Sequence, residues 1–317
     1  MSEVVDGVLL LDKPYGLSSN AALQHARRLL EARKAGHSGT LDPLATGLLP
    51  LCFGEATKFA QCLLDADKIY RTHIKLGITT ATADAEGQVC SVKPVTASLS
   101  DIVALLPQFT GCIEQTPPMF SALKYQGKAL YHYARAGIMI ERPKRAAIVH
   151  SIKLLSYHDA IVELEVHCAK GVYIRSLAEA IGMALGCGAH VIRLCRQQSS
   201  SFKLADAIQL DVLAACRLTQ RRQLLLPVDS LLAQYPQVIL DILQGERIQR
   251  GLPIMRSELQ VPLGRVRLYT EQELCSPIFI GVGELVSDGW LYPRRLLSTT
   301  NRGSLECSEV ESSNSKD

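Results

Sequence analysis

Four side chains in this 317-residue sequence have types and settings that could carry chemistry: Asp42, Arg175, Tyr70 and His37. Asp42 lies in a loop rich in glycine, serine and threonine at residues 36–43. A carboxylate in such a loop can act as a nucleophile, provided that it is ionised. It can equally open an Asx turn, because aspartate before proline is common in turns. The residue types leave both interpretations open.

The other three side chains also have structural interpretations. Arg175 lies at an expected turn between a strand and a helix, where an arginine can form an ion pair or face solvent. Tyr70 lies on the apolar face of an expected strand, as a core tyrosine would. His37 is a single loop histidine, and its type alone assigns it no role. These residues are therefore candidates by their type and position in the sequence, which do not show whether they lie together in the fold.

The elements that must position these residues follow from the apolar periodicity. Residues 7–11 form a short apolar run that ends in a turn, which predicts a buried strand. Residues 69–76 and 161–168 alternate between apolar and polar side chains, as half-buried strands do. Helices are expected after the capping residues 18–20, over residues 98–106, and from about residue 176. Because strands and helices interleave without regular alternation, the sequence predicts an α+β fold rather than a doubly wound one.

The length and the changes of composition along the chain predict two domains. A boundary is expected near Tyr235 and Pro236, beyond which short strands separated by glycines indicate a small β-rich unit. We assign residues 1–233 to the larger domain, with a basic, tyrosine-containing insertion at about 95–150, and residues 234–297 to the β-rich domain. Residues 298–317, which are rich in serine, glutamate and asparagine, are predicted to be a disordered tail.

Composition and motifs argue against several classes of protein. The net charge of +3 and the basic pairs, such as Arg27 with Arg28, permit an RNA partner without proving one. There is no long apolar run for a membrane helix and no basic start of a signal peptide, so we expect a cytoplasmic protein. The ten cysteines form no CxxC pair, and HExxH and glycine-rich phosphate-binding motifs do not occur. The sequence therefore predicts neither a metal nor a nucleotide cofactor.

Twelve consecutive residues around Asp42 resemble a known signature. The stretch GHSGTLDPLATG at 36–47 is similar to the signature loop of the bacterial tRNA pseudouridine-55 synthases, the TruB-type family. The resemblance runs from about residue 7 to residue 203, and residues 264–297 resemble, less specifically, the PUA-like RNA-binding domain of that family. Further matching motifs are DKPYG at 12–16, GEATK at 54–58, KIY at 68–70, QTPP at 115–118, SALK at 121–124, GVYIRS at 171–176 and GCGAH at 186–190.

The resemblance implies an enzyme that isomerises a uridine in the T loop of tRNA, at position 55, to pseudouridine without a cofactor. It also implies a mixed-sheet catalytic domain with an inserted RNA-binding segment. Asp42 would be the nucleophile, attacking ribose C1′ or uracil C6 or assisting glycal formation, and these three routes stay open. Arg175 would keep Asp42 ionised, because a neighbouring positive charge favours the carboxylate form.

The resemblance also implies roles in holding the RNA. Tyr70 is implied as a catalytic residue that stacks on the target base or assists removal of the C5 proton. Stacking is favoured, since a phenol with an ordinary pKa near 10 is a poor base at neutral pH. The target uridine must be flipped out, at a cost of a few kcal/mol. The residues implied to contact substrate or RNA are His37, filling the vacated space, Tyr173 and Leu194, lining the uracil pocket, and Lys58 and Lys13, contacting the pocket or phosphates.

Two other interpretations share parts of this pattern. The guide-RNA-dependent pseudouridine synthases of eukaryotes and archaea share the signature loop, but the plain C-terminal unit and the central motifs favour the bacterial type. A non-catalytic protein that binds tRNA or assists its folding would have no need for Asp42, Tyr70 and Arg175 together. The family further implies a monomer that requires no protein partner.

Overall fold

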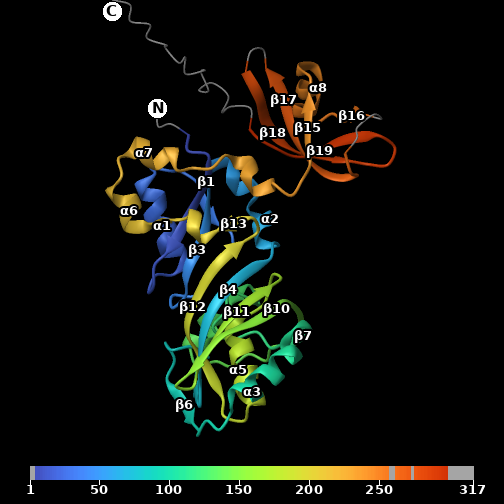
Figure 1. The fold of residues 1–317 in the computed structure, drawn as a ribbon. Helices are drawn as coiled ribbons and strands as arrows, with labels where there is room; N and C mark the ends of the chain where they lie inside the picture. The colour runs from blue at the N-terminus through green and yellow to red at the C-terminus, as the bar shows by residue number, and fades with distance from the viewer. Residues whose placement is uncertain (1–3, 257–260, 273–274, 299–317) are drawn as a thin grey trace, which may run out of the picture.

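The structure, a computed structural model, describes residues 4–256, 261–272 and 275–298. Figure 1 shows an elongated α+β domain with a smaller β-rich domain at one end. The expected α+β fold class with a β-rich C-terminal unit is therefore confirmed. The tail expected at 298–317 falls almost entirely outside the described residues.

A ten-stranded mixed sheet is the central element of the larger domain. The pairs β1 with β14 and β3 with β12 are parallel, and the other pairs are antiparallel. The side strands β2 (Ala35–His37) and β13 (Phe202–Lys203) pair with β3 and β12. The main path runs β14 (Ile208–Gln209), β1 (Gly7–Lys13), β3 (Thr46–Phe53), β12 (Ala189–Ser199), β4 (Lys68–Leu76), β11 (Ile161–Cys168), β10 (Arg145–His158) and β7 (Gly111–Gln115).

Short helices and two small hairpins connect these strands. The hairpins are β5 (Ile78–Thr80) with β6 (Val89–Val92), and β8 (Lys124–Tyr125) with β9 (Lys128–Ala129). The helices of this domain are α1 (Ser19–Leu29), α2 (Ala60–Leu64), α3 (Leu99–Leu105), α4 (Leu130–Arg135), α5 (Ile174–Ala184), α6 (Leu210–Ala215) and α7 (Leu218–Gln223).

The strands and helices expected from periodicity are present with small shifts at their ends. Strand β11 occupies residues 161–168, and β1 continues two residues beyond the predicted apolar run. Ser98 caps α3 through a capping box with Asp101, as its position before the apolar residues predicts. Helix α5 begins at Ile174, two residues earlier than expected, which places Arg175 inside its first turn.

The stretch at about 95–150, expected as an insertion, is joined to the main sheet at both ends. Strand β7 and the first residues of β10 pair with each other, from Arg145 opposite Gln115 to Val149 opposite Gly111. The hairpin β8–β9 and helix α4 lie between them in the chain and carry most of its tyrosines. The domain boundaries themselves remain a prediction.

One large core lies between the sheet and helices α1 and α5 (Figure 1). Leu23 and Leu177 of the helices are buried with Leu49 and Ile74 of the strands in this core. Each large side chain buried there contributes roughly 1.5–3 kcal/mol. This packing fixes the strand ends and the helix start that carry the candidate site.

The C-terminal domain is a five-stranded sheet with one helix. It contains β15 (Gln237–Leu240), α8 (Ile242–Gln249), β16 (Ile254–Met255), β17 (Gly264–Gln272), β18 (Cys275–Leu285) and β19 (Trp290–Leu296), in the sheet order β15-β17-β18-β19-β16.

A shared apolar cluster joins the two domains. The ring of Phe59 packs edge-on against Phe279, with centroids 5.9 Å apart, and Val282 joins the same cluster.

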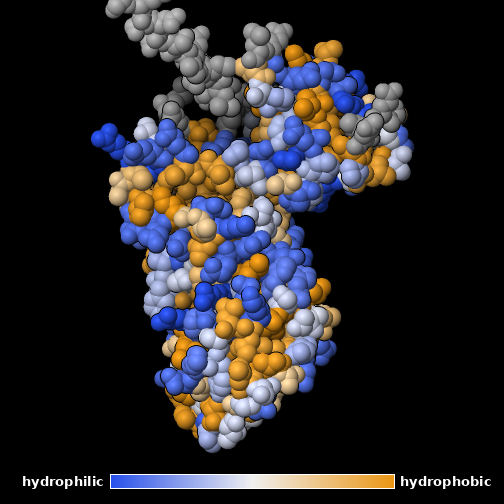
Figure 2. Space-filling model, viewed as in Figure 1, coloured by the Kyte–Doolittle hydropathy of each residue, from blue (hydrophilic) through white to orange (hydrophobic). Residues whose placement is uncertain are grey.

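On the outside of the C-terminal domain, Figure 2 shows apolar residues over α8, where Ile242 and Leu243 are exposed. No helix among the described residues is long and apolar enough to cross a membrane.

Candidate active site

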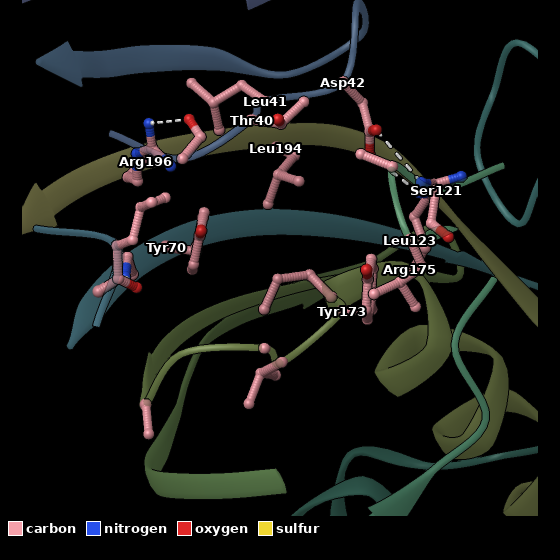
Figure 3. Close-up of a pocket in the computed structure, with 18 residues that line it drawn as sticks. Thr40, Leu41, Asp42, Tyr70, Ser121, Leu123, Tyr173, Arg175, Leu194 and Arg196 are labelled. Atoms are coloured by element: carbon pink, nitrogen blue, oxygen red, sulfur yellow. Dashed lines mark hydrogen bonds and ion pairs between the residues drawn. The ribbon is translucent and has the colours of Figure 1, made fainter. Parts of the chain in front are cut away.

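Five of the eight predicted site residues line one cavity of about 350 Å³. In Figure 3, Asp42 and Arg175 face each other at one end of this cavity, and Tyr70 lies toward the other end beside Arg196. The volume is within the range of about 300–1,000 Å³ typical of small-ligand pockets. The five predicted residues are Asp42, Tyr70, Tyr173, Arg175 and Leu194.

Asp42 and Arg175 form a two-point ion pair across the loop and the helix. Nε of Arg175 lies 2.9 Å from Oδ2 of Asp42, and a terminal guanidinium nitrogen donates to Oδ1 at 3.2 Å. Paired contacts of this kind fix the orientation of a carboxylate as well as its charge. The Asp42 side chain is still 33% exposed, so the carboxylate also faces the cavity.

Arg175 itself is held on all sides and has little freedom to move. Its guanidinium donates to the carbonyl oxygens of Thr82 at 3.1 Å and Phe120 at 2.7 Å. Asp84, which is also buried, lies 3.6 Å from a terminal nitrogen. Because the Arg175 side chain is only 5% exposed, these contacts preset the geometry in which it meets Asp42.

The electrostatic setting of Asp42 is a balance of opposing effects. Burial raises the pKa of Asp42 above its ordinary value, and the nearby Asp84 adds to that increase. The positive charges of Arg175 and Lys13 act against it, with Arg175 the stronger of the two. The carboxylate therefore depends on these cations to stay ionised within the cavity.

The Asp42 loop is fixed by buried hydrogen bonds on both of its sides. The Ser19 hydroxyl accepts from the Leu41 amide at 2.7 Å, and Arg196 donates to the carbonyls of Gly39 and Leu48. At Gly47, φ is +97° and an added Cβ would lie 2.5 Å from the Arg196 carbonyl oxygen. Only glycine fits that close approach, which explains its place in the loop.

The aromatic residues of the cavity are two partly buried tyrosines, Tyr70 and Tyr173. Burial raises the pKa of the Tyr70 phenol, which makes the phenolate form still scarcer at neutral pH. Tyr173 stands just before α5, where its backbone amide donates to Gln115 at 3.1 Å and its carbonyl accepts from Gln115 at 3.3 Å. Leu194 on β12 completes the apolar wall.

The structure places the other three predicted residues outside the residues that line this cavity. Lys13 is fully buried, and its ammonium donates to the carbonyls of Pro14 at 2.9 Å and Leu17 at 2.6 Å. In this structure the Lys13 side chain supports the turn beside Asp42, and its expected contact with the pocket or a phosphate stays a prediction. His37 is half-buried at the end of β2, and its role as a space filler stays a prediction.

Lys58 lies at the junction of the two domains instead of in the cavity. Its ammonium contacts Glu55 at 2.6 Å, the Leu296 carbonyl at 3.1 Å and the Ser298 hydroxyl at 3.0 Å. These partners hold the side chain at the end of the C-terminal domain, and the expected contact with the pocket stays a prediction. A contact with an RNA phosphate at that junction stays a prediction.

Two buried cations in the cavity wall were not predicted. Arg196 is 1% exposed, and Lys68 donates to the carbonyls of Leu63, Leu64 and Ala66 at the end of α2. Burial lowers the pKa of Lys68 to about 8. A signal was present for Arg196, because it shares the strand phase of the inward-facing Leu194 while Arg193 faces solvent.

The chain matches known proteins over most of its length. Residues 27–174 match the family model for the TruB family pseudouridylate synthase N-terminal domain. Residues 175–233 match the tRNA pseudouridylate synthase B C-terminal domain, and residues 236–297 match the C-terminal model of pseudouridine synthase II TruB.

Named relatives and solved structures agree with these matches. The tRNA pseudouridine synthase B of Azoarcus sp. (strain BH72) is 50% identical over 93% of this chain and 96% of its own length. That of Dechloromonas aromatica (strain RCB) is also 50% identical, over 92% of this chain and 96% of its own. The crystal structure of a Cbf5-Nop10-Gar1 complex is 26% identical, with a TM-score of 0.66, covering 90% of this chain and 80% of that one. With relatives of half-identical sequence aligned over nearly its full length, the chain belongs to the TruB pseudouridylate synthase family.

Proposed function

We propose that this protein isomerises uridine to pseudouridine in the T loop of tRNA, at position 55, with Asp42 as the nucleophile. The observation that carries the proposal is the Asp42–Arg175 ion pair facing Tyr70 across one cavity. Relatives that are 50% identical over nearly the whole chain are named tRNA pseudouridine synthase B. The reaction needs one positioned carboxylate, a binding surface for a planar base and room for that base to turn.

The carboxylate can serve as nucleophile because Arg175 fixes its orientation and opposes the rise in its pKa that burial causes. The reaction breaks the bond between ribose C1′ and uracil N1 and forms one between C1′ and C5, with the C5 proton released. In each of the three open routes, Asp42 must reach the nucleoside as an anion. Its two contacts with Arg175 leave one third of the side chain facing the cavity, where the nucleoside would bind.

Tyr70 and the apolar wall would bind the flipped base. Stacking of a base on an aromatic ring contributes roughly 1–3 kcal/mol, which offsets much of the cost of removing the base from its helix. The raised pKa of Tyr70 favours stacking over proton abstraction as its role. Leu194 and Tyr173 close the sides of the same cavity.

The RNA would lie along the segment between β7 and β10. Lys124, Lys128 and Arg135 are carried there beside tyrosines, with Lys128 over the ring of Tyr133 at 5.3 Å. Positive charge interleaved with aromatic rings suits a folded single-stranded loop. We further propose that the protein works in the cytoplasm as a monomer without a protein partner.

A tritium-release assay tests this function. A T-arm RNA with tritium at C5 of its uridines is incubated with the protein and with Asp42→Asn, since forming the C1′–C5 bond must free that tritium. We expect release by the wild type and by the control Asp211→Asn, an exposed aspartate on α6, and none by Asp42→Asn. Release by Asp42→Asn would remove Asp42 from its role.

RNA binding by the same variants separates the competing functions. If the wild type and Asp42→Asn both bind the RNA and neither releases tritium, the non-catalytic binding or folding function is favoured. Activity on the bare T-arm RNA also argues against a requirement for a guide RNA.

A further inference from the structure

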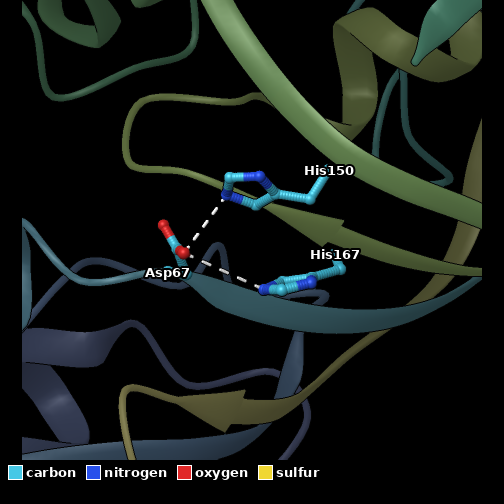
Figure 4. Close-up of side chains that lie close together, drawn as sticks. All are labelled: Asp67, His150 and His167. Carbon is cyan, nitrogen blue, oxygen red and sulfur yellow. Dashed lines mark ion pairs between the residues drawn. The ribbon is translucent and has the colours of Figure 1, made fainter. Parts of the chain in front are cut away.

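A second cluster of side chains lies outside the active-site cavity, formed by Asp67, His150 and His167. Figure 4 shows both imidazole rings beside the Asp67 carboxylate. Oδ2 of Asp67 lies 3.2 Å from Nε2 of His150 and 3.9 Å from Nε2 of His167. One donor atom from each residue falls within 4.8 Å of the others. We propose that this cluster is a binding site for a divalent transition metal, zinc in the first place.

The spacing of the three donor atoms suits a tetrahedral zinc site. With metal–ligand bonds of about 2.0–2.2 Å, neighbouring ligand atoms in a tetrahedron lie roughly 3.3–3.6 Å apart. The observed 3.2 and 3.9 Å bracket that separation. The small adjustment is within reach of side chains that are 37%, 40% and 50% exposed, for His150, His167 and Asp67 respectively.

The chemistry of the ligands selects the class of metal. Two imidazoles and one carboxylate suit zinc and its transition-metal neighbours, whereas magnesium and calcium prefer sites made of oxygen atoms. Three protein ligands leave one tetrahedral position for water or another small ligand. The partial exposure of all three side chains gives the ion a path from solvent.

The sheet builds the cluster from three segments that are distant in the sequence. His150 lies on β10 and His167 on the neighbouring β11, while Asp67 stands immediately before β4, the next strand of the sheet. The pairing register shifts between Val149 and Ser151, so His150 is the extra residue of a bulge. Bulges often redirect a side chain, and here the extra residue meets the ring of His167 with centroids 4.7 Å apart.

The proposed metal site is distinct from the active site. None of its three residues lines the cavity of Asp42, and Asp67 and His167 instead line a second cavity of about 530 Å³ that also includes Tyr235 and Arg265. A metal bound there would link the entry of β4 to β10 and β11. Because the ion would bind the folded chain and not the unfolded one, it should stabilise the fold.

Metal titration of the full chain tests the site. The protein is stripped with a chelator, then titrated with Zn²⁺ by calorimetry and with Co²⁺ by visible absorption, in parallel with thermal unfolding. We expect one site per chain and a melting temperature that rises with Zn²⁺ concentration. His167→Ala and Asp67→Asn should bind at least tenfold more weakly, and His158→Ala, an exposed histidine on the same strand as His150, should bind like the wild type.

Each other outcome overturns the proposal. Unchanged binding in His167→Ala and Asp67→Asn, with the charge-transfer band of a cobalt thiolate, would assign the metal to cysteines. If the wild type shows no binding and no thermal shift, the three residues form only an ion-paired cluster. Thermal unfolding of the stripped variants shows that each is folded, so a lost signal reports the site rather than the fold.

Discussion

Arg175→Lys is the most direct test of the proposed role of the ion pair. The substitution keeps the positive charge beside Asp42 but replaces a fork of donors with a single nitrogen. In the native side chain, three nitrogens share four acceptors, which are the two oxygens of Asp42 and the carbonyls of Thr82 and Phe120. One ammonium cannot reproduce contacts that lie on several sides of the guanidinium.

The size of the loss follows from those contacts. Losing one of the two bonds to the carboxylate costs about 1.5–3 kcal/mol, which is roughly a 10- to 150-fold change in rate. A displacement of the nucleophile by about 1 Å can cost another factor of ~100. We therefore expect kcat of Arg175→Lys to fall by about 10³- to 10⁴-fold, with little change in RNA affinity, because Arg175 is buried beneath Asp42.

The pH dependence separates orientation from charge. Burial raises the pKa of Asp42 and Arg175 opposes that increase, so activity is lost as the pH falls through this pKa and the carboxylate becomes protonated. Arg175→Met removes the opposing charge, which should move the acidic limb of the kcat profile to higher pH. Arg175→Lys keeps the charge and should leave the limb near its wild-type position.

Single-turnover tritium release across pH provides the assay. Each variant is present in saturating excess over the T-arm RNA, so that the single-turnover rate constant reports the bound complex rather than affinity or product release. An acidic limb that stays in place in Arg175→Met would refute the claim that Arg175 holds Asp42 ionised. A loss of less than about tenfold in Arg175→Lys would show that the two-point geometry is unimportant.

Two further predictions concern the residues around this pair. Tyr70→Phe keeps the ring and should retain kcat/KM within about threefold, while Tyr70→Ala loses roughly 1–3 kcal/mol of stacking and should fall about 5- to 150-fold in the same tritium assay. Burial lowers the pKa of Lys13 from 10.5 to about 8, so between these values the unfolded chain holds more protons than the folded one. Wild-type stability to urea should therefore gain an increment between pH 8 and 10 that Lys13→Met lacks, and equal pH profiles would contradict the buried position of Lys13.

The sequence predicts the local elements and the candidate site residues more fully than it predicts the residues that hold that site in place. Alternation at 161–168 predicts β11 because one face of that strand packs in the core. Asp42, Tyr70 and Arg175 are expected from the signature motifs, and they line one cavity in the fold. What brings them together is the pairing of β4 with β12 and β11, and a pairing register between distant segments has no local signal.

The supporting residues are harder to predict because their partners are backbone carbonyls. Lys13 and Lys58 carry the residue type of a phosphate contact, yet the structure turns both toward carbonyl oxygens. Composition gives the charge of a lysine but not the direction of its side chain, which depends on the turn around it. The cluster of Asp67, His150 and His167 likewise follows no spacing rule, since two strands and the residue before a third contribute one side chain each.

Buried cations around the cavity explain how the Asp42 carboxylate can stay ionised there. Arg175, Arg196, Lys13 and Lys68 are each less than 10% exposed and each donate to backbone carbonyl oxygens. Burying a charge is costly unless hydrogen bonds satisfy it, and these carbonyls do so without neutralising it. The cations therefore fix the loops and keep their positive charge available to the site. The charges of Arg175 and Lys13 oppose the increase in the Asp42 pKa that burial causes. The positive potential of all four cations would draw the phosphates of an RNA toward the cavity.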